Sequence, residues 1–456
     1  MSVKMKTPSV KMKDSGIEWI GEIPEHWEIV KISNIFSTRN TKVSDEDYPA
    51  LSVTKNGILP QLENVAKSDA HDNRKLVLKG DFAINSRSDR RGSCGMSDYD
   101  GSVSLIITVL KPENNIVTNY YHHLFRNPQF SDEFYRNGRG IVDDLWTTGW
   151  QNMKGIQIPH PPIEEQRLIA VQLNQICGTL DNTNADIEKQ IETLNEYKKS
   201  LITEAVTKGL DKNVEMKDSG IDWIGEIPEH WDFGKVKYFC RTRNQKYNKV
   251  MGELTYIALE NIESWNNKFI ETDSNYSLED TNICCNGDII FGKLRPYLAK
   301  VLQINKTSCC STEFAVFYNF KGITGYFKYL FTTNIFICEV NNSTSGVKMP
   351  RASTDFINNM YIPIPPINEQ QEIVAYLDSK CSEIDLIIET KKQQLELLEE
   401  YKKSIIYEYV TGKREVSTPI DEVTAPLDGV SAKPDFAVAQ NTQSVSIELA
   451  GDSLNE

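Results

Sequence analysis

Two long stretches of the chain repeat their apolar residues with the period of an α-helix. Residues 163–208 contain no proline and no glycine except Gly178, and the second stretch, which begins at residue 367, shows the same pattern up to Gly412. Proline precedes both stretches, and Gly209 and Gly412 follow them, as expected for helix starts and ends. The apolar positions recur mostly three, four or seven residues apart, which is the seam spacing of a coiled coil and predicts two long helices. These positions are Leu173, Ile176, Leu180, Ile187, Ile191, Leu194 and Leu201 in the first stretch, and Ile373, Leu377, Ile384, Ile388, Leu395, Leu398, Ile405 and Tyr409 in the second.

The residues that precede each long helix favour short strands. Runs of β-branched and aromatic residues lie at 102–110 (SVSLIITVL), 288–291 (DIIF) and 313–318 (EFAVFY), with Gly, Asn and Asp between them. A short helix is predicted at residues 120–125. The last 40 residues contain prolines, many Ser and Thr, and no periodicity, which predicts disorder.

The chain contains an internal repeat. MKDSGIEWIGEIPEHW at residues 12–27 returns as MKDSGIDWIGEIPEHW at 216–231, an offset of 204 residues. The segments IPHPPIEEQ and IPIPPINEQ, and the segments that begin EYKKS, keep the same offset. The residues between these blocks diverge, and GDFAINSRSDRRG is separated from GDIIFGKLRPYLAKV by 207 residues. Each repeat therefore joins a constant frame to a variable part.

The repeat predicts an α+β architecture, in which two homologous mixed α/β domains are separated by a long antiparallel two-helix coiled coil with pseudo-twofold symmetry. Only about seven residues separate the first helix from the second domain, so the two domains are expected at opposite ends of a rod of roughly 65 Å. The predicted parts, in chain order, are domain 1 (1–162), spacer helix 1 (163–210), domain 2 (211–366), spacer helix 2 (367–414) and an acidic tail (415–456). Because successive major-groove faces of DNA lie about 34 Å apart, two domains held in this way could span two of them.

The net charge of −14 is unevenly distributed over the 456 residues. Residues 164–215, 368–414 and 415–456 carry net charges of −4, −3 and −7, so the two predicted domains are neutral and can carry local basic patches. The chain has no apolar run long enough for a bilayer span or a signal peptide, so a cytoplasmic protein is expected. Nine cysteines without an export signal favour free thiols.

Catalytic motifs are not convincing. Residues 287–293 match the GxxxxGK pattern of a phosphate-binding loop, but Leu294 replaces the required Ser or Thr, and no helix-forming segment follows. The adjacent cysteine pairs at 284–285 and 309–310 lack the spacing of zinc ligands. Buried or half-buried free thiols on neighbouring strands are expected there instead. The six histidines are scattered. A non-catalytic chain without a metal site is therefore predicted.

Nucleic-acid contact has better candidates, because phosphates and guanine edges are bound by guanidinium and ammonium groups. One basic loop lies at residues 85–92, and the loop at 293–297 has the equivalent position in the second repeat. The alternative is that each cation is only a solvated surface charge. The candidate DNA-binding residues are Arg87, Arg90, Arg91, Lys293, Arg295, Tyr297, Lys348 and Arg351, with further basic positions at Arg136, Arg139, Arg241 and Arg243.

These motifs together resemble the specificity (S) subunit of type I restriction-modification enzymes, the HsdS family. The motifs are GEIPEHW at the start of each domain, IPxPPxxEQ before each helix, EYKKS near each helix end, and FGKLRPYLAKV within a variable part. The resemblance covers about residues 10–414. It implies two target-recognition domains that each read one half of a bipartite, asymmetric site in double-stranded DNA. It also places Glu165, Gln166, Glu369 and Gln370 in the frame motif as candidates for subunit docking.

The resemblance further implies two methyltransferase (M) subunits and translocating restriction (R) subunits as partners. S-adenosylmethionine, ATP and Mg²⁺ are then expected in those subunits and not in this chain, which has no (N/D)PP(F/Y) methyltransferase motif. A competing hypothesis is a coiled-coil adaptor that joins two protein partners and does not contact DNA.

Overall fold

The computed structural model describes residues 10–61, 72–113, 115–140, 146–247, 254–272, 280–344 and 349–416. The chain divides into two compact units, one of residues 1–174 with 406–456 and the other of residues 175–405. The first unit therefore includes the end of the second long helix, whereas the predicted boundaries placed that segment with the spacer. The predicted tail lies almost entirely outside the described residues.

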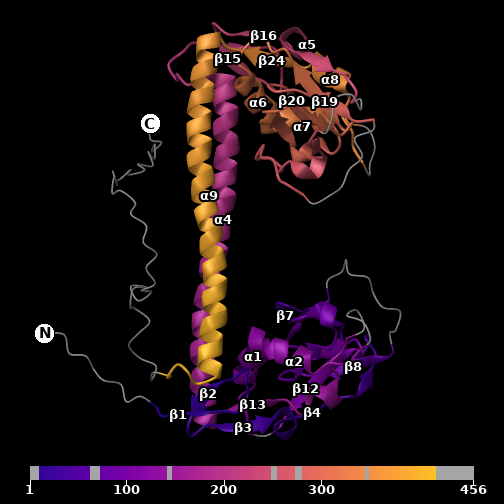
Figure 1. Cartoon of the computed structure of the whole chain (residues 1–456), viewed down its shortest axis with the longest axis vertical. Coiled ribbons are helices and arrows are strands. Elements are labelled where there is room, and N and C mark those ends of the chain that lie inside the picture. The colour runs from indigo at the N-terminus through magenta and orange to yellow at the C-terminus, as the bar shows by residue number, and fades with distance from the viewer. Residues whose placement is uncertain are drawn as a thin grey trace, which may run out of the picture. The chain divides into compact units, whose positions relative to one another are not determined.

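The first unit contains domain 1, in which small sheets are covered by short helices (Figure 1). A four-stranded sheet has the order β10-β9-β12-β4, a three-stranded sheet has the order β11-β8-β5, and hairpins β1-β2 and β6-β7 and the pair β13-β3 complete the strands. The strands are β1 (Met12–Asp14), β2 (Glu22–Pro24), β3 (Glu28–Lys31), β4 (Phe36–Thr38), β5 (Lys42–Val43), β6 (Leu51–Thr54), β7 (Gly57–Pro60), β8 (Arg74–Val77), β9 (Phe82–Asn85), β10 (Cys94–Met96), β11 (Gly101–Val103), β12 (Ile107–Pro112) and β13 (Gln157–His160). The helices are α1 (Thr118–Arg126), α2 (Pro128–Arg136) and α3 (Trp150–Met153).

Aromatic side chains on α1 and α2 form much of the core of domain 1. Phe125 lies with its ring centroid 5.0 Å from that of Phe82 on β9 and 4.7 Å from that of Phe130 on α2. Phe36 on β4 completes this group, and all four rings are buried. The burial of rings of this size stabilises the sheet against its helices and holds the start of β9 in place.

The second unit contains domain 2, which repeats this plan. Its larger sheet has the order β17-β23-β20-β21, and its smaller sheet has the order β18-β22-β19. The strands are β14 (Met216–Asp218), β15 (Glu226–Pro228), β16 (Asp232–Lys235), β17 (Arg241–Arg243), β18 (Tyr256–Ile257), β19 (Asn282–Cys284), β20 (Ile289–Gly292), β21 (Val301–Gln303), β22 (Ser308–Cys310), β23 (Phe314–Tyr318) and β24 (Tyr361–Ile364). The helices are α5 (Val236–Phe239), α6 (Thr324–Thr332), α7 (Asn334–Asn342) and α8 (Thr354–Asn359).

Two long helices, α4 (Ile163–Lys208) and α9 (Ile367–Val410), carry the predicted coiled-coil spacing. Within the second unit they lie side by side (Figure 1). Lys198 pairs with Asp385, Lys391 with Gln190 and Lys402 with Asp181, so residue numbers rise along one helix as they fall along the other. The two helices are therefore antiparallel.

Local predictions had different outcomes. The run at 102–110 forms two strands, β11 and β12, because a turn closes between them with the amide of Ile107 bonded to the carbonyl of Ser104 at 3.0 Å. The GxxxxGK match at 287–293 contains strand β20 in place of a phosphate-binding loop. The cysteine prediction is confirmed, since all nine cysteines are free, and Cys284 lies on β19, which pairs with strand β22 of Cys309 and Cys310.

Neither long helix is apolar enough for a bilayer, and none of the other helices in the described ranges has both the length and the hydropathy for a membrane crossing.

Candidate nucleic-acid interface

The basic loop of domain 1 begins where β9 ends and contains a short 3-10 helix (Ser88–Arg90). The side chains of Arg87, Arg90 and Arg91 are 44%, 68% and 59% exposed. Arg87 lies 2.9 Å from Asp89, and Arg91 stacks on the ring of Tyr135 at 5.0 Å. An exposed ion pair such as that of Arg87 with Asp89 costs little to open, so the guanidinium group can bind a phosphate.

A second segment of domain 1 is held against this loop by backbone hydrogen bonds. The amide of Ser88 donates to the carbonyl of Trp146 at 3.1 Å, and the amide of Thr148 donates to the carbonyl of Ser86 at 2.9 Å. Arg87 and Thr147 thus face each other as an antiparallel bridge. The loop is anchored on both sides, which positions its side chains.

The equivalent loop of domain 2 follows β20 and has the same anchoring. The amide of Arg295 donates to the carbonyl of Pro350 at 2.8 Å, and Leu294 forms an antiparallel bridge with Arg351. Arg295 adopts a left-handed backbone conformation with φ of 52° and leads into the 3-10 helix Pro296–Leu298. Arg295 and Tyr297 are exposed, the latter by 46%. The structure therefore brings the candidate Arg351 to the loop of Lys293, Arg295 and Tyr297.

Lys293 and Arg351 share an acidic neighbour that the sequence did not reveal. Arg351 forms an ion pair with Glu313, and the amide of Lys293 donates to the carbonyl of Glu313 at 2.8 Å. Burial lowers the pKa of Lys293, the nearby Glu313 opposes this shift, and Arg351 adds to it. Glu313 Oε2 is buried and has no hydrogen-bond partner among the described residues. Lys348, another candidate, lies outside the described residues.

Arg243 does not belong to this interface, contrary to its place among the predicted basic positions. Its guanidinium binds Asp288 through two hydrogen bonds of 2.8 and 3.1 Å, and Arg39 binds Asp81 in the same way in domain 1 at 2.6 and 3.1 Å. In each pair the aspartate raises the pKa of the arginine against the effect of burial. Both arginines are therefore structural.

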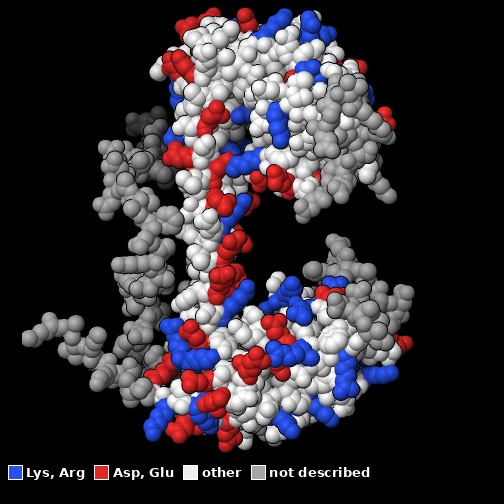
Figure 2. Space-filling model, viewed as in Figure 1, with Lys and Arg blue, Asp and Glu red and all other residues white. Residues whose placement is uncertain are grey.

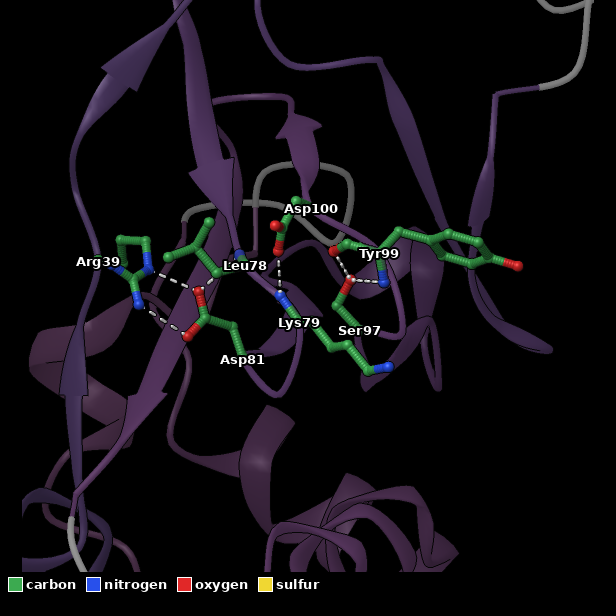
Figure 3. Close-up of polar contacts among 7 residues, drawn as sticks. All are labelled: Arg39, Leu78, Lys79, Asp81, Ser97, Tyr99 and Asp100. Carbon is green, nitrogen blue, oxygen red and sulfur yellow. Dashed lines mark hydrogen bonds and ion pairs between the residues drawn. The ribbon is translucent and has the colours of Figure 1, made fainter.

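Figure 3 shows how the Arg39–Asp81 pair supports the turn before β9. Asp81 accepts a further hydrogen bond from the amide of Leu78 at 2.9 Å, and Asp100 accepts one from the amide of Lys79 at 2.7 Å. Ser97 closes the neighbouring turn by donating its hydroxyl to the carbonyl of Tyr99 at 2.7 Å. These contacts fix the start of β9, and β9 in turn places the basic loop at its other end.

A hollow of about 460 Å³ lies beside the basic loop of domain 1. Both polar and apolar side chains line it, and two of the apolar residues, Leu105 and Ile106, are 40% and 49% exposed. Both lie in the turn between β11 and β12, within the run at 102–110 that favours strands. The hollow is lined by Thr38, Asn40, Lys75, Ser86, Arg87, Leu105, Ile106, Thr108, Thr147, Gly149 and Trp150.

The frame motif joins each domain to the start of its long helix. Glu165 lies 2.7 Å from His26 Nε2 and accepts a hydrogen bond from Trp27 Nε1 at 2.8 Å. Glu369 makes the same contacts with His230 and Trp231 at the same two distances. The repeated motifs GEIPEHW and PPxxEQ therefore meet in space.

The two glutamines of the frame motif are buried. The side chain of Gln166 accepts a hydrogen bond from the amide of Val117 at 2.9 Å and donates one to the carbonyl of Pro161 at 2.8 Å. Gln370 likewise accepts a hydrogen bond from the amide of Ile323 at 2.9 Å and donates one to the carbonyl of Pro365 at 2.8 Å. Both side chains are thus bonded within their own domains, while the docking role of these four residues stays a prediction.

Charge is mixed over the surface of each unit. Figure 2 shows Lys and Arg interspersed with Asp and Glu over the visible face of domain 1 and over that of domain 2. This agrees with the neutral sums over the two domains. Within the described residues, no group of three or more His, Cys, Asp or Glu side chains could hold a metal ion.

The comparisons with known proteins identify the family. The model of the type I restriction modification DNA specificity domain matches residues 24–193 and again residues 225–397. The chain therefore belongs to this family and contains two copies of its domain. The predicted resemblance and fold class are confirmed, and the adaptor hypothesis is not favoured.

Individual relatives extend over most of the chain. The type I restriction enzyme MjaVIII specificity subunit of Methanocaldococcus jannaschii is 27% identical over 86% of this chain and 93% of its own length. The type I restriction enzyme EcoDI specificity subunit of Escherichia coli is 23% identical over 86% of this chain and 90% of its own. A solved structure described in terms of complex assembly and conformational transition of the type I R-M system has a TM-score of 0.62 and 14% identity, and the match covers 86% of this chain and 99% of that one. The last match supports the fold.

Proposed function

We propose that this chain is the non-catalytic DNA-recognition subunit of a type I restriction-modification complex in the cytoplasm of a prokaryotic cell. Domain 1 and domain 2 each read one half of a bipartite, asymmetric site in double-stranded DNA. The paired helices α4 and α9 set the spacing between the halves. Two methyltransferase subunits dock on the chain, and restriction subunits join through them.

One observation carries this proposal: the two domains present equivalent loops on equivalent frames, but with different side chains. The contacts of Glu165 recur at Glu369 with the same distances, whereas the loops that follow β9 and β20 differ in sequence. A repeated scaffold with divergent exposed loops is what two readers of different half-sites require, because phosphate contacts position a protein while a few base contacts specify the sequence.

Chemistry is assigned to the partners. S-adenosylmethionine is expected in the methyltransferase subunits, and ATP and Mg²⁺ in the restriction subunits. The neutral charge of both domains supports a shared DNA affinity, since counterion release by basic groups dominates the strength of DNA binding.

The test is to co-express the chain with its methyltransferase subunit in a host free of DNA methylation and to map modified bases across the genome. A single bipartite motif with a fixed gap is expected. Exchange of residues 28–157 for those of another family member should change one half of the motif and leave the other half and the gap unchanged. A soluble, stoichiometric complex that produces no motif would contradict the proposed function.

A further inference from the structure

The strand registers of the two domains identify which side chains occupy equivalent places at the interface. Ile107 on β12 pairs with Asn85 on β9, and Phe314 on β23 pairs with Gly292 on β20. The residues just before Ile107 and Phe314 are Ile106 and Glu313. Position 106 of domain 1 therefore corresponds to position 313 of domain 2.

A second equivalence comes from the segment that bridges each loop. Thr147 bridges Arg87, which lies two residues after the end of β9, and Arg351 bridges Leu294, which lies two residues after the end of β20. Thr147 of domain 1 therefore corresponds to Arg351 of domain 2. The two equivalent pairs are Ile106 with Thr147, and Glu313 with Arg351.

These pairs carry opposite chemistry at the same place. In domain 1, Ile106 and Thr147 both line the hollow beside Arg87, and Ile106 leaves nearly half of its surface exposed. In domain 2, Glu313 and Arg351 form an ion pair, and the side chain of Arg351 is 58% exposed. One domain offers apolar groups, and the other offers hydrogen-bond donors beside an acceptor.

The major-groove edges of base pairs also differ in whether they offer hydrogen-bonding groups or an apolar methyl group. A G·C pair presents the acceptors N7 and O6 of guanine beside the N4 donor of cytosine. A guanidinium next to a carboxylate is complementary to this edge, because its donors face N7 and O6 while the carboxylate accepts from N4. Thymine presents a methyl group, which is recognised by apolar contact, including contact with the methyl group of threonine.

We propose that Glu313 and Arg351 read a G·C pair in the half-site of domain 2, and that Ile106 and Thr147 read the methyl group of a thymine in the half-site of domain 1. This inference rests on the proposed function and assigns specificity to one residue pair in each domain. Glu313, whose side chain is 23% exposed, supplies the acceptor for the cytosine amino group through Oε1, the carboxylate oxygen that faces Arg351. Arg351 turns its exposed guanidinium toward guanine.

The test exchanges the two pairs between the domains. The chain is co-expressed with its methyltransferase subunit, and the methylated motif is mapped for the wild type, for E313I/R351T and for I106E/T147R. In E313I/R351T, one position of one half-site should lose its preference for G·C by about 5- to 150-fold, the range for one bidentate contact, with the other half unchanged. In I106E/T147R, the preference for T at one position of the other half-site should fall.

Conservative variants protect the test against failure of assembly. E313Q and R351K keep the shape of the site, and R351K keeps its charge but loses the planar fork, so both should relax the same position as E313I/R351T. Lys306→Ala is the matched control, because it removes an exposed cation of domain 2 away from the site and should leave the motif intact.

The outcomes separate the two proposals. If the wild-type complex yields no bipartite motif, the proposed function fails. If the wild type yields one and the assembled variants leave every position unchanged, or lose methylation uniformly over all sites, the base-reading assignment is overturned. A domain 2 half-site without any G·C pair would overturn it equally.

Discussion

Glu165 and Glu369 show how a repeated residue can have a structural role that the sequence does not reveal. Each carboxylate accepts from a tryptophan indole and lies 2.7 Å from a histidine that is 139 residues earlier in the chain. The glutamate thereby ties the first turn of a long helix to the start of its own domain. Removing its charge weakens both contacts, since hydrogen bonds to charged groups are stronger than neutral ones.

We therefore expect Glu165→Gln to lower the free energy of unfolding by about 1.5–3 kcal/mol, the range for hydrogen bonds to charged groups. The neutral amide has one acceptor oxygen in place of two charged ones, so both contacts can no longer be made to a carboxylate. Urea unfolding of the full chain, followed by tryptophan fluorescence, measures the change. Glu369→Gln should have the same effect on domain 2.

The control for this prediction is the neighbouring residue Glu164, whose side chain is 73% exposed. Glu164→Gln should change the free energy of unfolding by no more than about 0.5 kcal/mol, as is usual for surface substitutions. An equal effect of the two substitutions would show that the bonds of Glu165 to His26 and Trp27 contribute nothing specific.

At the scale of helices, the first lysine of each EYKKS motif pairs with an aspartate of the opposite helix. Lys198 lies 2.6 Å from Asp385, and Lys402 pairs with Asp181. The two pairs differ in burial, since the side chains of Lys198 and Asp385 are 8% and 20% exposed, whereas those of Lys402 and Asp181 are 22% and 57% exposed. Domain 2 covers the first pair, where Lys268 also reaches Asp385 at 3.2 Å.

This difference predicts unequal effects of equivalent substitutions. Asp385→Ala leaves the buried ammonium of Lys198 without its counter-ion and should lower the free energy of unfolding by about 3–5 kcal/mol. Asp181→Ala breaks the more exposed pair and should cost about 0–1 kcal/mol. Circular dichroism at the helix band during urea unfolding measures both, and a larger loss for Asp181→Ala would contradict the argument from burial.

At the scale of the whole molecule, the distribution of charge limits what the chain does alone. Its net charge is −14 and its two domains are neutral, so few phosphates can be neutralised without partner subunits. In the described part of the two loops and of the segment that bridges the second loop, the exposed cations are Arg87, Arg90, Arg91, Arg295 and Arg351. Five exposed cations are enough to position the chain on DNA but neutralise too few phosphates for tight binding.

We expect the isolated chain to bind a duplex containing its site with Kd of about 10⁻⁴–10⁻⁶ M at physiological salt, the range of non-specific binding. The complex with methyltransferase subunits should bind at least about a hundredfold tighter. Fluorescence anisotropy with a labelled duplex, at fixed salt, measures both affinities. An isolated chain that binds as tightly as the complex would show that the partners add no phosphate contacts.

The sequence by itself determined the long helices, the repeat and the frame motifs. The seam spacing at positions such as Leu173 and Ile373 predicts helices because it depends only on local periodicity. The equivalence of the loops at 85–92 and 293–297 also followed from sequence, because each loop follows a segment that begins with Gly-Asp and occupies the same place between the constant blocks of its repeat. The basic candidates were found in this way.

Only the tertiary structure decided which residues meet at those loops. Glu313 lies 38 residues before Arg351, and Ile106 lies 41 residues before Thr147, so strand pairing over these separations brings each pair together. The turn at Leu105 and Ile106 was hidden within an apolar run that has the composition of one strand. It is set by the registers of β11 with β8 and of β12 with β9, which are long-range pairings that local sequence does not specify.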